Sequence, residues 1–360
     1  MRVRRGLLLV AIAGAQFALF ETALRTWGHS EAAPAFQELF IPDPVIGYRL
    51  RPDARVRFAT AEFDTAIAVN AQGVREDTPI GPKPPNERRI VVLGDSLVMS
   101  VQVDARQTFC KLLEDRLNRT AGPIHYRVIN AGVQGYGPVE ELLFFRQIAR
   151  AFEPDLVIET VFVGNDAEEA FGSSPRLRAR PLADSVSESL VARLRRVVRR
   201  SMVLQVIRLR VVSVTGRLSN WISPPEAPLQ SYAEQPAARI DQGVRVTRDC
   251  VQAIADEAKA AGARTMVMLM PARFQVDDAD FGRLKQAVEA AGGKLVRDAA
   301  TERFDRALAD VAVPRFDALP PLRAALPGPP VFFEQTVHLT PRGHEVVAAA
   351  LEAFLRRQGI

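Results

Sequence analysis

The sequence predicts a three-layer α/β/α fold with a doubly wound, mainly parallel sheet, together with an N-terminal membrane helix and a helical insertion. Three observations lead to this prediction. From Arg89 onward, short apolar runs alternate with amphipathic segments, the pattern of parallel strands covered by helices on both faces. The chain begins with a basic cluster and an apolar run. Between about residues 172 and 238 the alternation of strands and helices is interrupted.

The individual elements follow from the lengths and boundaries of these runs. Buried strands are expected at Ile90–Leu93, Tyr126–Ile129, Leu156–Val163 and Met266–Met270, with a shorter last strand at Arg315–Leu319. Helices are expected at about Ala105–Asn118, Val139–Ala151 and Ile240–Ala261. The last helix has the clearest start, because Thr340 can cap it and Pro341 suits its first position.

The region before the main domain divides into two parts. Residues 1–26 combine the basic cluster Met1–Arg5 with the apolar run Gly6–Phe20, so the chain after them is expected to be translocated. Whether this segment is a signal-anchor or a cleaved signal peptide stays open. Residues 27–86 are expected to form an extended pre-domain with short strands and a linker, and residues 87–360 the main domain.

The insertion at about residues 172–238 contains a basic amphipathic stretch. It begins with a capping box at Ser185–Glu188 and continues with leucines and valines among arginines from Leu190 to Arg200. This stretch is either a lid over the active site, a helix resting on anionic lipid, or a helix that packs its apolar face on the domain.

Composition excludes several classes of function. A net charge of +5 spread over 360 residues produces only a weak electrostatic field. The sequence also has no helix-turn-helix, RNA-binding or zinc-finger motif, so nucleic acid is not expected as a partner. Cys110 and Cys250 lie 140 positions apart and are expected to be buried thiols, with a disulfide in an exported protein as the alternative left open. With four histidines and two cysteines, no metal site and no cofactor are predicted.

Reactive residue types gather where predicted strands end or helices begin, the places at which chemistry collects in open α/β sheets. These places are Gly94–Ser96, Asn130–Gly137, Gly164–Asp166 and His338–His344. A serine at a strand-to-helix turn is exposed, glycines free a backbone N–H, and an asparagine is a neutral donor for a developing negative charge.

The four segments, in this order, resemble the blocks of the SGNH/GDSL hydrolase family. The resemblance covers about residues 89–166 and 331–355. It implies that Ser96 is the nucleophile and His338 its base. It also implies an oxyanion hole formed by the N–H groups of Ser96 and Gly135 and the side-chain amide of Asn165. Gly135 is preferred to Gly132 because it lies five residues after Asn130, as the family's glycine commonly does.

The sequence departs from the family at the acid that orients the histidine. The family usually has an aspartate two or three residues before it, but here Thr336 and Gln335 occupy these positions. Glu334 is the predicted substitute, with Gln335 or a backbone carbonyl as alternatives. His344 is expected on the surface of the last helix, and Asp95 is expected to brace its turn rather than to react.

The pre-domain also resembles that of bacterial membrane-anchored members, at Glu21–Arg25, Pro42–Arg49 and Val69–Arg75. This resemblance implies attachment to the cell inner membrane with a periplasmic catalytic domain. It implies a serine ester hydrolase for O-acyl, above all O-acetyl, groups of envelope or exopolysaccharide glycans. The alternatives are an O-acyltransferase with the same residues, a lipase or thioesterase, and a non-catalytic glycan-binding or assembly factor. The oligomeric state is not predicted.

Overall fold

The computed structural model describes residues 38–120, 122–178, 227–290 and 292–359. The expected membrane segment at residues 1–26 and the basic amphipathic stretch of the insertion lie outside these residues. Within the described ranges, no helix is both long and apolar enough to cross a membrane. Attachment to a membrane therefore remains a prediction from the sequence.

The centre of the fold is a five-stranded sheet in which every neighbouring pair is parallel. The strands are β5 (Glu87–Gly94), β6 (His125–Gly132), β7 (Leu156–Phe162), β8 (Arg264–Met270) and β9 (Arg315–Asp317), in the spatial order β6-β5-β7-β8-β9. Each expected strand is present. β7 is buried at every position, because its two faces are covered and its two edges are paired.

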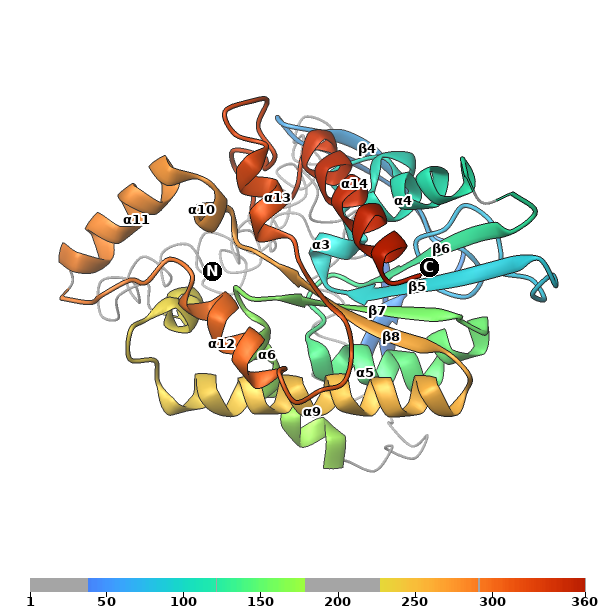
Figure 1. Ribbon diagram of the computed structural model, residues 1–360, viewed down its shortest axis with the longest axis horizontal. Helices are drawn as coiled ribbons and strands as arrows, with labels where there is room; N and C mark the ends of the chain where they lie inside the picture. The colour runs from blue at the N-terminus through green and yellow to red at the C-terminus, as the bar shows by residue number, and fades with distance from the viewer. Residues whose placement is uncertain (1–37, 121, 179–226, 291, 360) are drawn as a thin grey trace, which may run out of the picture. The chain divides into compact units, whose positions relative to one another are not determined.

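Helices cover both faces of the sheet, which confirms the three-layer prediction (Figure 1). One face carries α5 (Pro138–Gln147), α6 (Asp166–Ser173), α9 (Ala238–Ala260) and α12 (Ala299–Ala307). The other carries α3 (Ser96–Met99), α4 (Phe109–Asn118), α13 (Leu319–Ala324) and α14 (Pro341–Arg357). Short 3₁₀ segments are η1 (Ala105–Gln107), η2 (Ala149–Phe152), η3 (Ser174–Arg178) and η4 (Ala227–Tyr232).

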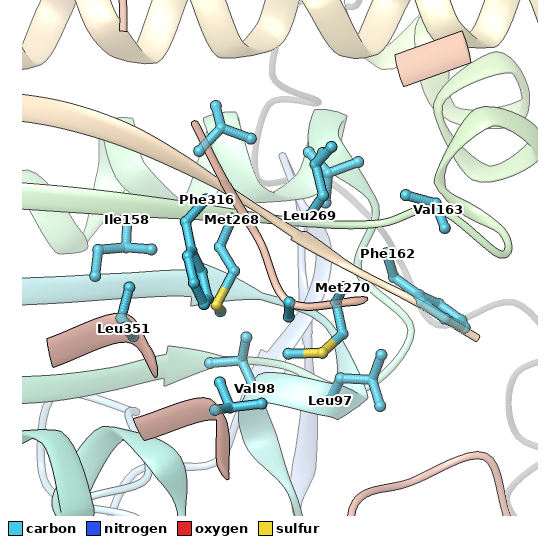
Figure 2. Packing of buried hydrophobic residues seen from close by; sticks show 14 of the residues in the cluster. Leu97, Val98, Ile158, Phe162, Val163, Met268, Leu269, Met270, Phe316 and Leu351 are labelled. Atoms are coloured by element: carbon cyan, nitrogen blue, oxygen red, sulfur yellow. The ribbon is translucent and has the colours of Figure 1, made fainter. Parts of the chain in front are cut away.

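The core lies between these layers. Figure 2 shows Met268 of β8 and Phe316 of β9 close to Leu351 of α14, with Leu97 of α3 nearer the end of β8. Each of these side chains is almost completely buried. Full burial of a large apolar side chain contributes about 1.5–3 kcal/mol. Cys110 and Cys250 are also buried, and both are free thiols.

Helix boundaries agree with the sequence where a cap defines them. Thr340 Oγ1 accepts the N–H of Gly343 at 3.2 Å and Pro341 is the first residue of α14, as expected. The helix expected from Ala105 begins later, at Phe109, because Thr108 caps it. Several helices had no expected range, among them α6, α12, α13, α10 (Arg273–Val276) and α11 (Asp278–Ala290). α11 buries no residue completely and extends outward in Figure 1.

The pre-domain contains two antiparallel hairpins, β1 (Phe40–Asp43) with β2 (Gly47–Leu50) and β3 (Arg55–Ala59) with β4 (Asp64–Ala68). Short strands were expected in this region from the sequence. Arg75, which is 1% exposed, donates to the carbonyl oxygens of Met99, Ser100 and Val103 at 2.5–2.6 Å. The pre-domain thereby fastens the segment that leaves α3, the helix that begins at Ser96.

Candidate active site

The strand-end residues are brought together by the parallel sheet. β5, β6 and β7 are neighbours, so the segments after their carboxyl ends share one edge of the sheet. These segments carry Ser96, Gly135 and Asn165 respectively. The strand order reverses here, since β6 and β7 flank the first strand, β5. This is the position at which open α/β sheets form their crevice.

Ser96 is held at a tight turn from β5 into α3. Gly94 is required there because a Cβ atom would overlap the side chain of Val98. Asp95 Oδ1 accepts the N–H of Leu97 at 2.8 Å, which confirms that Asp95 braces the turn. Burial raises the pKa of Asp95 to about 6. Ser96 itself is half-buried, whereas the residues on either side of it are buried.

The glycine segment after β6 is tied to the same helix. Asn130 Nδ2 donates to the carbonyl oxygen of Val98 at 2.7 Å, and a Cβ at Gly132 would overlap the backbone of Met99. Gly135 has φ +73°, a left-handed conformation that favours glycine. Its N–H has no hydrogen-bond partner within the described part of the chain, so it is free to bind a ligand oxygen.

Asn165 lies at the start of α6, directly after β7. Its side chain Nδ2 donates to Glu169 Oε1 at 2.8 Å, one helical turn further on. Sequence reasoning missed Glu169, although its position four residues after Asn165 at the start of a helix was a usable signal. Burial raises the pKa of Glu169 to about 8, and the nearby charges of Asp95 and Glu140 add to the effect.

His338 lies in the segment before α14. Its ring nitrogens Nδ1 and Nε2 are both buried and have no hydrogen-bond partner among the described residues. Burial lowers the pKa of His338 to about 4, so the imidazole is neutral at pH 7 and able to accept a proton. Ser96 Oγ lies 3.5 Å from Asp95 Oδ2 and makes no hydrogen bond to His338. Catalytic hydrogen bonds are often long or absent before substrate binds.

The structure does not bring Glu334 to His338. Glu334 is exposed, and its carboxylate forms no hydrogen bond or ion pair within the described ranges. Its backbone is fixed instead, with the N–H donating to Glu62 Oε1 at 2.8 Å and the carbonyl oxygen accepting from Arg273. The His338 backbone is held on both sides, by Thr336 Oγ1 at 3.3 Å and by the N–H of Phe333 at 2.9 Å.

The expectation that His344 lies on the helix surface is wrong. His344 is 1% exposed and stacks on Phe109 with a 5.9 Å separation of ring centroids. Its Nδ1 accepts the N–H of Phe109 at 3.1 Å, which supplies a partner to the first turn of α4. Burial lowers the pKa of His344 to about 3. It therefore joins α14 to α4 and is not a general base.

Acidic side chains are buried beneath the site. Asp95, Glu141, Glu159 and Asp166 are each at most 4% exposed. Burial raises the pKa of Glu159 to about 7, and burial together with the neighbouring charge of Glu159 raises the pKa of Glu141 well above its usual range. Within the described ranges, no three His, Cys, Asp or Glu side chains are arranged to hold a metal ion.

A cavity of about 560 Å³ opens beside Asn165. Most of its lining is apolar, from Phe162, Leu229, Tyr232, Phe274, Leu284, Ala287 and Val337. Asp280, which pairs with both Arg273 and Arg283, gives it one polar side. The lining includes Asn165, the predicted oxyanion donor, and Val337, the residue before the predicted base.

Comparison with solved structures finds several that resemble this chain. The acetyl xylan esterase AlAXEase is 11% identical, with a TM-score of 0.42 over 74% of this chain and 98% of that chain. The esterase EstA from Pseudoalteromonas sp. is 12% identical, with a TM-score of 0.40 over 75% and 98%. The lipase/acylhydrolase from Enterococcus faecalis is 13% identical, with a TM-score of 0.41 over 75% and 96%. Sequence identities and TM-scores this low carry no information about the activity of this chain.

A family model gives a more direct result. Residues 230–360, which include His338, match the SGNH hydrolase-like domain of acetyltransferase AlgX. The search of curated proteins found no match. His338 lies in the matched segment, whereas the predicted Ser96, Gly135 and Asn165, which follow β5, β6 and β7, lie before it. Residues 230–360 therefore resemble an SGNH hydrolase-like domain, and the family of the whole chain enters the proposal below.

Proposed function

We propose that this protein is a serine ester hydrolase of the SGNH/GDSL family that removes O-acyl groups, above all O-acetyl groups, from envelope or exopolysaccharide glycans. The observation that carries the proposal is the shared edge of three neighbouring strands. There the half-buried Ser96, the N–H of Gly135, which has no partner among the described residues, and the amide of Asn165 follow one another. This combination supplies a nucleophile and oxyanion donors on rigid elements.

The reaction proceeds through an acyl-enzyme. Ser96 Oγ attacks the ester carbonyl carbon while the neutral imidazole of His338 accepts its proton. The carbonyl oxygen becomes an oxyanion held by the N–H groups of Ser96 and Gly135 and the Asn165 amide. His338 then protonates the leaving alcohol, and water, activated by the same imidazole, releases the acid. Each oxyanion donor is worth about 2.7–4 kcal/mol of transition-state stabilisation.

O-acyl transfer is the second candidate. The matched family model is named for an acetyltransferase, which favours this alternative. The residues and the acyl-enzyme are the same, but a sugar hydroxyl replaces water in the second step. The apolar lining of the cavity beside Asn165 also fits a longer acyl chain, as in a lipase or thioesterase.

We further propose that the protein is attached to the cell inner membrane with its catalytic domain in the periplasm. The support is the basic cluster Met1–Arg5 followed by the apolar run Gly6–Phe20. Protease accessibility of the main domain in spheroplasts, compared with intact cells, tests this orientation.

The test of the activity uses full-length protein. Wild type, Ser96→Ala and the control Ser174→Ala, at the end of α6, are assayed on p-nitrophenyl acetate, p-nitrophenyl butyrate and an O-acetylated glycan. Hydrolysis by wild type and Ser174→Ala, lost in Ser96→Ala, supports the proposal. Acyl transfer to an added deacetylated glycan identifies a transferase. Full activity in Ser96→Ala, or neither reaction in folded wild type, contradicts the proposal.

A further inference from the structure

Glu169 lies against Asn165 of the proposed oxyanion hole and against Gly137, in the glycine segment that also carries Gly135. Its Oε1 accepts the Nδ2 hydrogen of Asn165 at 2.8 Å. A Cβ atom on Gly137 would lie 2.8 Å from Cβ and 3.2 Å from Oε2 of Glu169, so the same side chain packs against the glycine segment. Glu169 Oε2 is buried and has no hydrogen-bond partner among the described residues.

The surroundings of Glu169 disfavour a negative charge. Titratable groups face it from four elements: Tyr48 of β2, Asp95 at the start of α3, Glu140 of α5, and Asp166 and Glu168 of α6. Within the described ranges, the arginines that pair with neighbouring acids are engaged there, Arg176 with Glu140 and Arg239 with Glu168. A buried carboxylate with an unpaired oxygen among other acids is costly, so the neutral acid is favoured up to mildly alkaline pH.

We propose that neutral, protonated Glu169 is a positioning residue that holds the Asn165 amide in the oxyanion hole, and that its ionisation at alkaline pH switches the hole off. The inference rests on the proposed function. With the proton on Oε2, Oε1 accepts one amide hydrogen of Asn165 and leaves the other for the oxyanion. When the proton passes to solvent, a full negative charge stands beside the donor and opposes the developing oxyanion.

The kinetic test measures kcat and KM of the full-length protein on p-nitrophenyl acetate across neutral and alkaline pH. We expect wild-type kcat to fall with a midpoint near pH 8. Glu169→Ala should lower kcat at neutral pH about tenfold with little change in KM, because the amide loses its orientation. Glu169→Gln should recover most of this loss and lack the alkaline fall, because glutamine mimics the neutral acid. The control Glu289→Gln, an exposed position on α11, should keep the wild-type profile.

A second readout does not depend on turnover. In full-length protein labelled with ¹⁵N-asparagine, the Asn165 side-chain signal is assigned by its absence in Asn165→Ala. We expect this signal to titrate with the alkaline midpoint in wild type and to stay fixed in Glu169→Gln.

The outcomes separate this inference from the proposed function. Three outcomes would overturn the role of Glu169. The first is a fall in kcat at alkaline pH that persists in Glu169→Gln, and the second is wild-type turnover in Glu169→Ala. The third is an Asn165 signal that does not titrate in active enzyme. A titrating Asn165 signal in a protein that neither hydrolyses nor transfers acyl groups would instead overturn the proposed function, while supporting the coupling of Glu169 to Asn165.

Discussion

The hydroxyl of Tyr48 in β2 donates a hydrogen bond to the carbonyl oxygen of Gln134 at 2.8 Å. The contact is reciprocal, because the Tyr136 hydroxyl donates to the Tyr48 carbonyl oxygen at 2.6 Å and the two rings pack edge to face. A Cβ atom on Gly135 would lie 2.9 Å from the Tyr48 hydroxyl. The pre-domain hairpin therefore forms part of the wall around the predicted oxyanion donor.

Tyr48→Phe should lower kcat about fivefold, because a net hydrogen bond of about 1 kcal/mol no longer fixes the Gln134 carbonyl and the adjacent Gly135 N–H. KM should change little. Steady-state kinetics on p-nitrophenyl acetate test this. Tyr126→Phe is the control, because the Tyr126 hydroxyl has no hydrogen-bond partner in the described residues. Equal kcat in both variants would show that Tyr48 only supports the fold.

Asn165→Ala should lower kcat about 10²–10³-fold, the usual cost of removing one oxyanion donor, with a much smaller effect on KM. Thermal unfolding of the variant should remain close to wild type, because Asn165 is only half-buried. A variant with wild-type kcat would remove Asn165 from the oxyanion hole.

Glu334→Ala should leave kcat unchanged from acid to neutral pH, because the Glu334 carboxylate is exposed and makes no hydrogen bond to His338. His338→Ala should abolish turnover. The kcat values of Glu334→Ala and His338→Ala are measured as a function of pH in the same experiment. A slower Glu334→Ala enzyme would mean that substrate binding draws Glu334 to His338 and restores the orienting acid.

Gly243→Ala should destabilise the protein by about 3 kcal/mol or more, because a Cβ at Gly243 of α9 would overlap the carbonyl group of Ala167 in α6. The control is Gly282→Ala in α11, where a Cβ meets nothing within 4 Å. That change should stabilise by about 0.5–1 kcal/mol, since glycine is a poor helix former. Urea unfolding measures both, and a destabilisation of equal size in both variants would contradict the close helix packing.

Stability should fall as pH rises toward 7 because of Glu159. Burial raises the pKa of Glu159 in the folded protein to about 7, above its value in the unfolded chain. The contribution of protonated Glu159 to the free energy of unfolding is therefore complete below the unfolded pKa of about 4.3 and is lost as pH rises through about 7. Between these values the free energy of unfolding should fall by up to about 1.4 kcal/mol per pH unit. Urea unfolding at several pH values should show a smaller decline in Glu159→Gln, while the exposed control Glu289→Gln should follow wild type.

The local sequence determined the strands, the last helix and the strand-end residues. Parallel strands covered on both faces must be continuously apolar, so β5, β6, β7 and β8 could be recognised one by one. Because parallel strands end at one edge, the order of the motifs was enough to predict that Ser96, Gly135 and Asn165 share an edge. A cap such as Thr340 acts within one helical turn and is likewise readable from sequence.

Only the tertiary structure decided which side chains surround those residues. Tyr48 reaches Gln134 from 86 residues away, and the burial of His344 against Phe109 joins positions 235 residues apart. The separation of the Glu334 carboxylate from His338 and the unpaired oxygen of Glu169 likewise depend on how whole elements pack. Periodicity and capping report interactions within a few residues along the chain, whereas burial and charge at the site are set by segments that meet only after folding.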